Sequence, residues 1–341
     1  MAMSTVRVED AVGMVLGHDL TKIAPGEYKG PAFKKGHIIK PEDIPHLKNI
    51  GKNYIYLIEL TADQLHENQA ADRIAQAVSS DTVIINQPSE GRVNLKADIT
   101  GILQVNREAV TAINSVENIV FSTLHGGSIV QAGTTIAGVK VVPLVVEEAL
   151  IRQVESIASQ YTGIMAIKPL HNKQVGLIIT GNEVYYGRIQ DKYAAVFTEK
   201  ATKYGATLVD VVYQPDDSRL IADSILQYQQ QGMDIVIAAG GMSVDPDDVT
   251  PDAIRSTGAQ VVTYGTPVLP GAMFMLAYLG DMVILGMPAC GMYSKTTVFD
   301  LVFPKVLADI KMTKQDFAAM GYGGLCLDCD ICTFPHCPFG K

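Results

Sequence analysis

Short apolar runs that end in glycine or acidic residues recur through the second half of the chain. Four such runs cover residues 174–180, 206–213, 235–239 and 282–285. Between and after them lie stretches with helical periodicity, at residues 193–204, 219–231, 251–256 and 293–309. Alternating strands and helices are typical of a mostly parallel sheet with helices on both faces. The pattern therefore predicts an α/β domain with three layers at residues 171–310.

The first 170 residues have a different pattern. Glycine and proline break residues 20–50 into short strands and turns, and residues 91–146 alternate apolar and polar side chains, as in VNLKADITGILQV. Asp63 to Val78 has helical periodicity, and so does Glu147 to Tyr161, which we expect to be a connecting helix. Residues 1–170 are therefore predicted to form a β-rich N-terminal region, and residues 311–341 remain as a Cys-rich tail.

The four apolar runs of the α/β domain end in turns that suit a ligand site. The run at 235–239 stops at Gly240-Gly241, and glycine lets a ligand approach the backbone closely. Glu183, Asp217 and Asp248 follow three of the runs within a few residues. In open α/β sheets, ligands bind in the crevice outside the carboxyl ends of the strands. We therefore expect the four turns to converge on one crevice.

The turns also carry a family resemblance. The motifs are TGNE (180–183), PDD (215–217), GGMSVDPDD (240–248), the Pro270-Gly271 step and GMPACG (286–291). In this order they resemble the molybdopterin-binding domain of molybdenum-cofactor biosynthesis, and most of all the molybdopterin molybdotransferases. The resemblance covers about 174–309, and VEDAVGMVLGHDL (8–20) with FKKGHII (33–39) resembles the start of the longer members. It implies a Rossmann-like domain that inserts molybdate into adenylated molybdopterin.

The resemblance also implies roles for individual residues. A carboxylate accepts the paired N–H donors of a pterin edge, and Glu183 and Asp217 are both candidates for this contact. Asp217 and Asp248 are the expected catalytic residues, and Asp248, with Asp245, is expected to hold Mg²⁺. The residues expected to bind the cofactor are Thr180, Gly181, Glu183, Asp216, Gly240, Gly241, Ser243, Pro270, Gly271, Pro288 and Gly291.

Departures from the family motifs leave three functions open. The family's PGKP step is Pro270-Gly271-Ala272-Met273 here, so its lysine is absent. The family's LPGNP is replaced by Met287 to Gly291, and the amino-terminal Ser-x-Met-Asp-Gly segment is missing. The loss of lysine favours a non-catalytic carrier or sensor of the molybdenum cofactor, whereas the retained carboxylates favour an enzyme. A nucleotide pyrophosphatase is the third hypothesis, because the competence-damage-inducible family shares this domain.

The tail carries a second motif. Cys326, Cys329, Cys332 and Cys337 have the spacing C-x2-C-x2-C-x4-C-P, one residue longer than a bacterial ferredoxin run. Thiolates at this spacing can wrap one metal centre, and either zinc or an iron–sulfur cluster fits them. His336 adds a nitrogen ligand if the metal is zinc. The alternative is a tail of free or redox-exchanging thiols.

Length, charge and composition indicate the number of domains and the kinds of partner to expect. The chain has 341 residues, which indicates two or three domains, and a net charge of −9. Its basic residues are scattered, so nucleic acid is an unexpected partner. No apolar run is long enough to span a membrane, and the first residues have no signal-peptide pattern. We expect a cytoplasmic homo-oligomer whose partners are molybdopterin or its adenylated form and molybdate.

Overall fold

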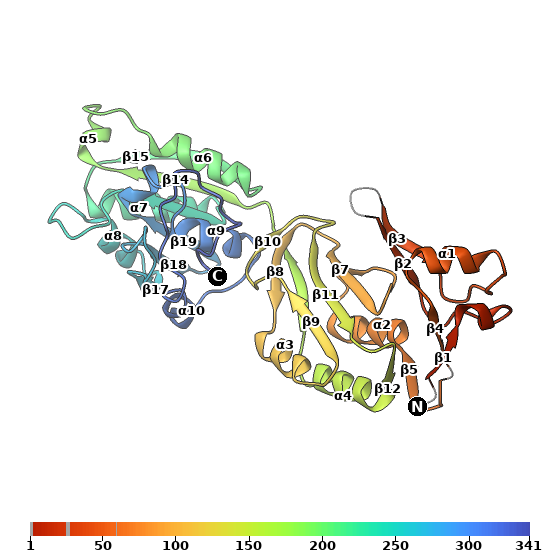
Figure 1. Ribbon diagram of the computed structural model, residues 1–341. Coiled ribbons are helices and arrows are strands. Elements are labelled where there is room, and N and C mark those ends of the chain that lie inside the picture. The colour runs from red at the N-terminus through yellow and green to blue at the C-terminus, as the bar shows by residue number, and fades with distance from the viewer. Residues whose placement is uncertain (1–2, 25–27, 59) are drawn as a thin grey trace. The chain divides into compact units, whose positions relative to one another are not determined.

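A computed structural model describes residues 3–24, 28–58 and 60–341 (Figure 1). The chain divides into two compact units. The first comprises residues 1–99, 104–124 and 132–166, and the second comprises residues 100–103, 125–131 and 167–341.

The second unit is built on a six-stranded sheet (Figure 1). Its strands are β14 (Gln174–Thr180), β15 (Thr207–Gln214), β16 (Ile235–Ala239), β17 (Gln260–Tyr264), β18 (Met275–Leu279) and β19 (Met282–Met287). Their order is β15-β14-β16-β19-β18-β17. The first four strands are parallel, while β18 and β17 run antiparallel to their neighbours. The predicted α/β class with a mostly parallel sheet is confirmed.

Helices cover both faces of this sheet, which explains why its central strands are apolar throughout. Leu177 and Ile179 of β14 pack in one core with α6 (Tyr193–Lys203) and α9 (Val298–Leu307). Ile178 points the other way and packs in a second core with α7 (Ser218–Gln230) and α8 (Thr250–Ser256). Successive side chains of a strand point to opposite faces, so one strand serves both cores.

Two features of the second unit differ from the sequence prediction. Helix α9 begins at Val298 rather than at 293, because Thr297 and Asp300 form a capping box that fixes its start. The short helices α5 (Asn182–Tyr185) and η2 (Ala289–Met292) instead follow β14 and β19 directly. Residues 311–341, expected as a separate tail, contain α10 (Lys314–Ala319) and lie within this unit, with Phe317 and Phe339 buried in its core.

The chain before β14 is rich in strands, as predicted. They are β1 (Met3–Arg7), β2 (Leu20–Ala24), β3 (Tyr28–Phe33), β4 (Tyr54–Ile58), β5 (Gln64–His66), β6 (Val83–Ile85), β7 (Arg92–Ala97), β8 (Gly101–Val105), β9 (Ile119–Thr123), β10 (Ile129–Val130), β11 (Thr135–Val141), β12 (Val145–Glu147) and β13 (Met165–Pro169). The helices are η1 (Val8–Ala11), α1 (Asp43–Asn49), α2 (Glu67–Val78), α3 (Arg107–Asn114) and α4 (Glu148–Ser159). Strands β6, β7, β11 and β9 form an antiparallel sheet, and α2 packs on β7 and β11.

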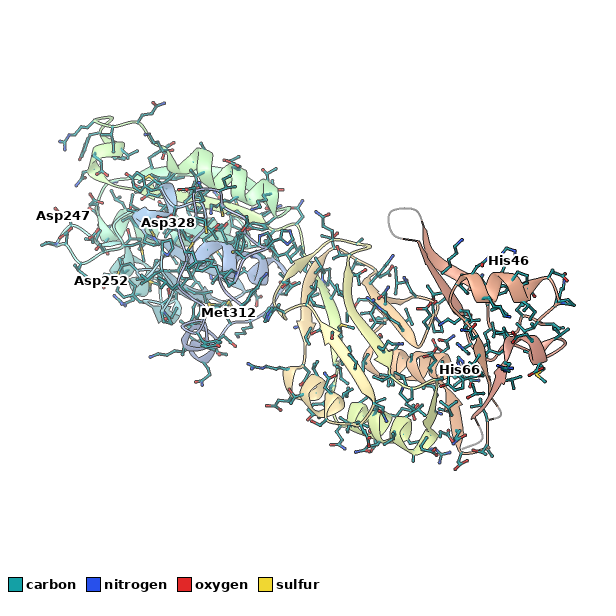
Figure 2. All side chains as sticks on the ribbon, in the orientation of Figure 1. His46, His66, Asp247, Asp252, Met312 and Asp328 are labelled. Atoms are coloured by element: carbon teal, nitrogen blue, oxygen red, sulfur yellow. The ribbon has the colours of Figure 1, made fainter. Side chains whose placement is uncertain are left out.

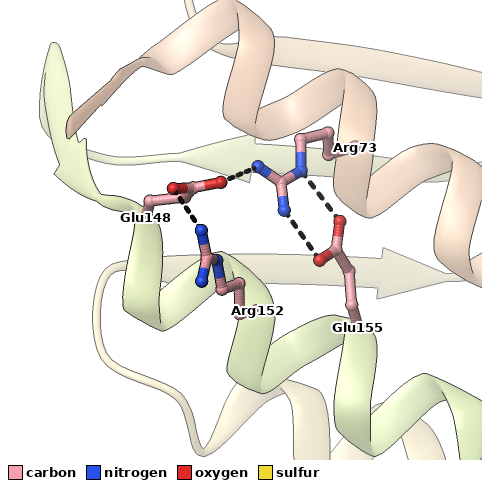
Figure 3. Close-up of polar contacts among 4 residues, drawn as sticks. All are labelled: Arg73, Glu148, Arg152 and Glu155. Carbon is pink, nitrogen blue, oxygen red and sulfur yellow. Dashed lines mark hydrogen bonds and ion pairs between the residues drawn. The ribbon is translucent and has the colours of Figure 1, made fainter. Parts of the chain in front are cut away.

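An ion-pair network joins α2 to α4 within the first unit (Figure 3). Arg73 donates two parallel hydrogen bonds to Glu155, of 2.8 and 2.7 Å, and one of 2.8 Å to Glu148. Arg152 donates to the other oxygen of Glu148 at 2.9 Å. The guanidinium of Arg73 lowers the pKa of Glu155 and also that of Glu148. Paired charges of this kind fix the relative position of the two helices.

Candidate functional site: a crevice at the carboxyl ends of four parallel strands

The turns after β14, β15, β16 and β19 line one cavity of about 1040 Å³. Because these strands are adjacent and parallel, their carboxyl ends meet at one edge of the sheet. The predicted convergence of the four turns is therefore confirmed. We call this cavity the crevice.

Most of the residues expected to bind the cofactor line the crevice. They are Thr180, Gly181, Glu183, Asp216, Gly240, Gly241, Ser243 and Pro288, and Asp248 joins them. Four other predicted residues do not line it: Asp217, Pro270, Gly271 and Gly291. The sequence prediction passed over several residues that do, among them Asp191, Lys192, Tyr193, Asp247 and Tyr293.

The Gly240-Gly241 turn has a backbone that only glycine adopts readily. Gly240 has φ of 108° and Gly241 has φ of 56°. A side chain at Gly240 would collide with the carbonyl oxygen of Thr180, and one at Gly241 would lie 2.8 Å from the hydroxyl oxygen of Thr250. The hydroxyls of Thr180 and Thr250 are 3.2 Å apart and buried, so they join the end of β14 to the start of α8. The floor of the crevice is thus close-packed backbone.

Asp216 ties the ends of β14 and β15 together. Its carboxylate accepts a hydrogen bond of 2.9 Å from the backbone N–H of Asn182, and the Asn182 side chain accepts one of 3.4 Å in return. Burial raises the pKa of Asp216, and the neighbouring carboxylates Glu183, Asp247 and Asp248 raise it further. Asp216 is thus a half-buried acid at the wall of the crevice, held in place before any ligand arrives.

Asp217 caps a helix instead of facing the crevice. Its carboxylate accepts hydrogen bonds from the backbone N–H groups of Arg219 and Leu220, at 2.9 and 3.1 Å, at the start of α7. An aspartate just before a helix satisfies N–H donors that have no partner within the helix. Of the two adjacent aspartates, the structure therefore places Asp216 at the crevice and uses Asp217 for the fold.

Asp248 closes the acidic loop that follows the glycine turn. Its carboxylate accepts a hydrogen bond of 3.0 Å from the N–H of Asp245, whose carbonyl oxygen accepts one of 2.9 Å from the N–H of Asp248. Asp247 is exposed on the same loop, between β16 and α8 (Figure 2). Within residues 3–24, 28–58 and 60–341, no group of three or more His, Cys, Asp or Glu side chains is placed to hold one metal ion. The Mg²⁺ site at Asp248 thus stays a prediction.

The crevice is strongly acidic. Six carboxylates line it: Glu183, Asp191, Asp216, Asp245, Asp247 and Asp248. Among the residues that the structure describes, Lys192 is the one basic side chain in this lining. A phosphate brought against these carboxylates is repelled unless a cation or backbone N–H groups offset their charge. An anionic ligand of this site is therefore expected to bind together with a divalent cation.

Three predicted residues, Pro270, Gly271 and Gly291, lie outside the lining of the crevice. Gly271 has φ of 125°, and a side chain there would meet Val298 at the start of α9. Pro270 follows a cis peptide bond and lines a different cavity, so the crevice wall at this turn is Ala272 and Met273. Gly291 is buried behind its neighbours.

The wall formed by η2 and α6 is aromatic and carries a thiol. Burial raises the pKa of Tyr193 to about 12, and nearby Tyr293 and Cys290 add to the effect. Burial also raises the pKa of Cys290, so this thiol stays protonated near neutral pH. Tyr293 is 80 % exposed. The two tyrosine rings offer a flat apolar surface for a ligand, and the protonated thiol of Cys290 is a weak nucleophile.

Residues 176–308 match a family described as "Probable molybdopterin binding domain". Over these residues the chain is similar to the molybdopterin-binding family. The resemblance on which the sequence prediction rested is thereby confirmed. Residues 5–59 match a second family, described as a domain of unknown function. That segment contains the motifs at 8–20 and 33–39 that resemble the start of the longer molybdotransferases.

Curated relatives match part of this chain and part of their own length. A molybdopterin molybdenumtransferase of Synechococcus elongatus is 26% identical over 141 residues, which are 39% of this chain and 35% of that protein. A CinA-like protein of Mycobacterium tuberculosis is 28% identical over 90 residues, which are 26% of this chain and 21% of that protein. The chain thus spans about a fifth to a third of the length of these relatives. The solved structure of the molybdopterin biosynthesis enzyme MoaB from Thermus thermophilus is similar with a TM-score of 0.34 at 19% identity, over 40% of this chain and 96% of that chain.

No helix in the described part of the chain combines the length and the apolar character that a membrane crossing requires.

Proposed function

We propose that the crevice binds molybdopterin, free or adenylated, and that the protein inserts molybdate into the adenylated form. One observation carries the proposal: the turns of four adjacent parallel strands line one crevice inside a domain of the molybdopterin-binding family. Molybdate as the second substrate, a homo-oligomeric assembly and a cytoplasmic location belong to the same proposal.

In this proposal the pterin edge meets a carboxylate of the crevice. Glu183 is exposed and lines the crevice, so its oxygens are free to accept paired N–H donors. Asp216 is the second candidate, and it takes the place that the sequence prediction gave to Asp217. The ring would lie against the apolar wall that includes Tyr193 and Tyr293.

The phosphate end is proposed to bind at the glycine turn with Mg²⁺. Gly240 and Gly241 line the crevice, and the backbone N–H of Gly241 would be the donor to a phosphate, because that of Gly240 already donates to the carbonyl oxygen of Met287 at 3.4 Å. Asp248, with Asp245, would supply oxygen ligands to Mg²⁺. The ion would offset part of the negative charge of the six carboxylates of the lining and of the phosphates. The protein's own part is then to orient the ligand and to hold the metal ligands in place.

A carrier or sensor of the finished cofactor is the second candidate. The crevice has Ala272 where the family's lysine stands, and its lining holds one lysine against six carboxylates. Among the described residues of the lining, Lys192 is then the single cationic side chain that could stabilise the charge that develops when a phosphoanhydride breaks. The CinA-like relatives keep a nucleotide pyrophosphatase as a third possibility.

One assay separates the three. The full chain, purified without oxygen, is incubated with adenylated molybdopterin, Mg²⁺ and molybdate, and the products are resolved by chromatography. The proposal expects the molybdenum cofactor and AMP, both dependent on molybdate and Mg²⁺. AMP released without molybdate would favour the pyrophosphatase, and bound but unchanged ligand would favour the carrier.

A further inference from the structure

The four cysteines of the C-terminal segment surround a second cavity. Cys326, Cys329, Cys332 and Cys337 all line it, and it offers about 50 Å³, several times the roughly 10–15 Å³ that one water molecule needs. His336 does not line it. The cavity lies within the second unit, and we call it the thiol cavity.

Backbone hydrogen bonds hold the segment around this cavity in a fixed loop. The N–H of Gly340 donates to the carbonyl oxygen of Gly323 at 2.9 Å and closes the base of the loop. Leu269 donates to Gly324 and accepts from the N–H of Cys326, both at 2.8 Å. The buried ring of Phe339 anchors the end of the loop in the core. The thiols are therefore presented by an ordered loop rather than by a loose tail.

Polar groups lie close to the thiols. The hydroxyl of Thr296, a buried residue, lies 3.3 Å from the sulfur of Cys332. The ammonium of Lys295 donates to the carbonyl oxygen of Asp330 at 2.7 Å, which places a positive charge on the same loop. Hydrogen bonds to sulfur and a nearby cation are features of metal–thiolate centres.

We propose that Cys326, Cys329, Cys332 and Cys337 bind an iron–sulfur cluster in the thiol cavity. Four thiolates are the usual ligands of such a cluster, and the spacing with Pro338 after the last cysteine is close to that of bacterial ferredoxins. Among the described residues no three of these thiols are placed to hold one metal ion, although all four line the same cavity. This arrangement suits a cluster, whose iron atoms lie between the thiolates, better than a single zinc ion bound at about 2.3 Å from each sulfur. On binding, each cysteine gives up its thiol proton and its sulfur bonds to iron.

The thiol cavity and the crevice share two wall segments. Pro270 lines the thiol cavity, and Ala272 and Met273 after it line the crevice. Tyr293 lines the crevice, and Ser294 to Thr296 after it line the thiol cavity. A cluster bound in the thiol cavity would restrain both segments of the chain, at residues 270–273 and 293–296. This consequence rests on the proposed function, whereas the cluster itself does not.

The test is the metal content of the full chain purified without oxygen. We expect iron and acid-labile sulfide in equal amounts, together with visible absorption from sulfur-to-iron charge transfer. Cys329→Ser and Cys332→Ser should each lower the iron content severalfold. Both cysteines are exposed, so these changes leave the packed core intact. Cys290→Ser is the matched control, because Cys290 lines the crevice and not the thiol cavity, and it should retain the iron.

Three results would overturn the cluster: zinc without sulfide, a chain free of metal with every thiol titratable, or iron that stays bound in the Cys329→Ser, Cys332→Ser double variant. Loading is measured without any pterin, so its failure is distinguishable from failure of the proposed function. Circular dichroism of each variant checks that the fold is retained.

Discussion

Replacement of Asp248 by asparagine separates function from folding at the acidic loop of the crevice. The Asp248 carboxylate accepts one hydrogen bond, of 3.0 Å, from the N–H of Asp245. An asparagine oxygen can accept the same bond. The cost is then the difference between a charged and a neutral acceptor, about 1 kcal/mol. For a unit of this size that lowers Tm by roughly 2–4 °C. The proposed Mg²⁺ ligand, however, is lost.

The assay is the rate of molybdate insertion with and without Mg²⁺, followed in parallel with thermal unfolding. Asp248→Asn should slow the Mg²⁺-dependent rate at least tenfold, which corresponds to about 1.4 kcal/mol. Asp252→Asn is the control, because Asp252 lies on α8 outside the lining of the crevice and pairs with Arg255 at 2.7 Å (Figure 2). An unchanged rate in Asp248→Asn, or a fall in Tm far beyond that of the control, would refute the reasoning.

Three further changes test the structure more widely. Gly240→Ala should lower the free energy of unfolding by well over the about 1–2 kcal/mol that we expect for the control Gly258→Ala. Both glycines have a positive φ, but of the two only a side chain at Gly240 would collide with backbone atoms. Urea unfolding measures both losses, and equal losses would contradict the geometry of the turn. Arg73→Met should lower the free energy of unfolding by about 1 kcal/mol at pH 7. The loss should be much smaller once the pH falls through the depressed pKa of Glu155, because protonation of Glu155 ends its ion pair with Arg73. A loss that does not change with pH would contradict this reasoning. The raised pKa of Asp216 means that the folded state favours the protonated carboxyl, so the free energy of unfolding falls as the pH rises through that pKa. Asp216→Asn should remove this fall in urea unfolding measured across the pH range. A fall that persists in the variant would show that another group is responsible.

The fold of the second unit was predictable because its strands are buried on both faces. Such strands are apolar throughout, as at Gln174–Thr180, and the predicted bounds of β14 and β16 match the structure. The start of α9 was not predictable from periodicity, because Thr297 and Asp300 end the preceding loop by a local cap. Strands β17 and β18 were not predicted, because β17, β18 and β19 follow one another without the helices that the predicted alternation requires.

The location of the crevice could be predicted from the sequence, but the side chains that line it could be predicted only in part. Glycines and acidic residues after apolar runs indicate a strand end that receives a ligand, as at Gly240. Which of two adjacent aspartates faces the ligand depends on backbone direction, so Asp216 and Asp217 could not be told apart. Asp191 and Tyr193 were missed because they lie outside the motifs, just before and at the start of α6, and only the tertiary fold shows that they face the crevice.

Calorimetry with isolated molybdopterin tests the central claim most directly. The full chain is titrated without oxygen, with and without Mg²⁺, beside the Glu183→Ala, Asp216→Ala double variant and the Asp252→Asn control. We predict saturable binding that Mg²⁺ strengthens, that the double variant weakens at least tenfold, and that the control retains. No saturable binding by the unaltered chain, or equal binding by the double variant, would contradict the assignment of the crevice as the molybdopterin site.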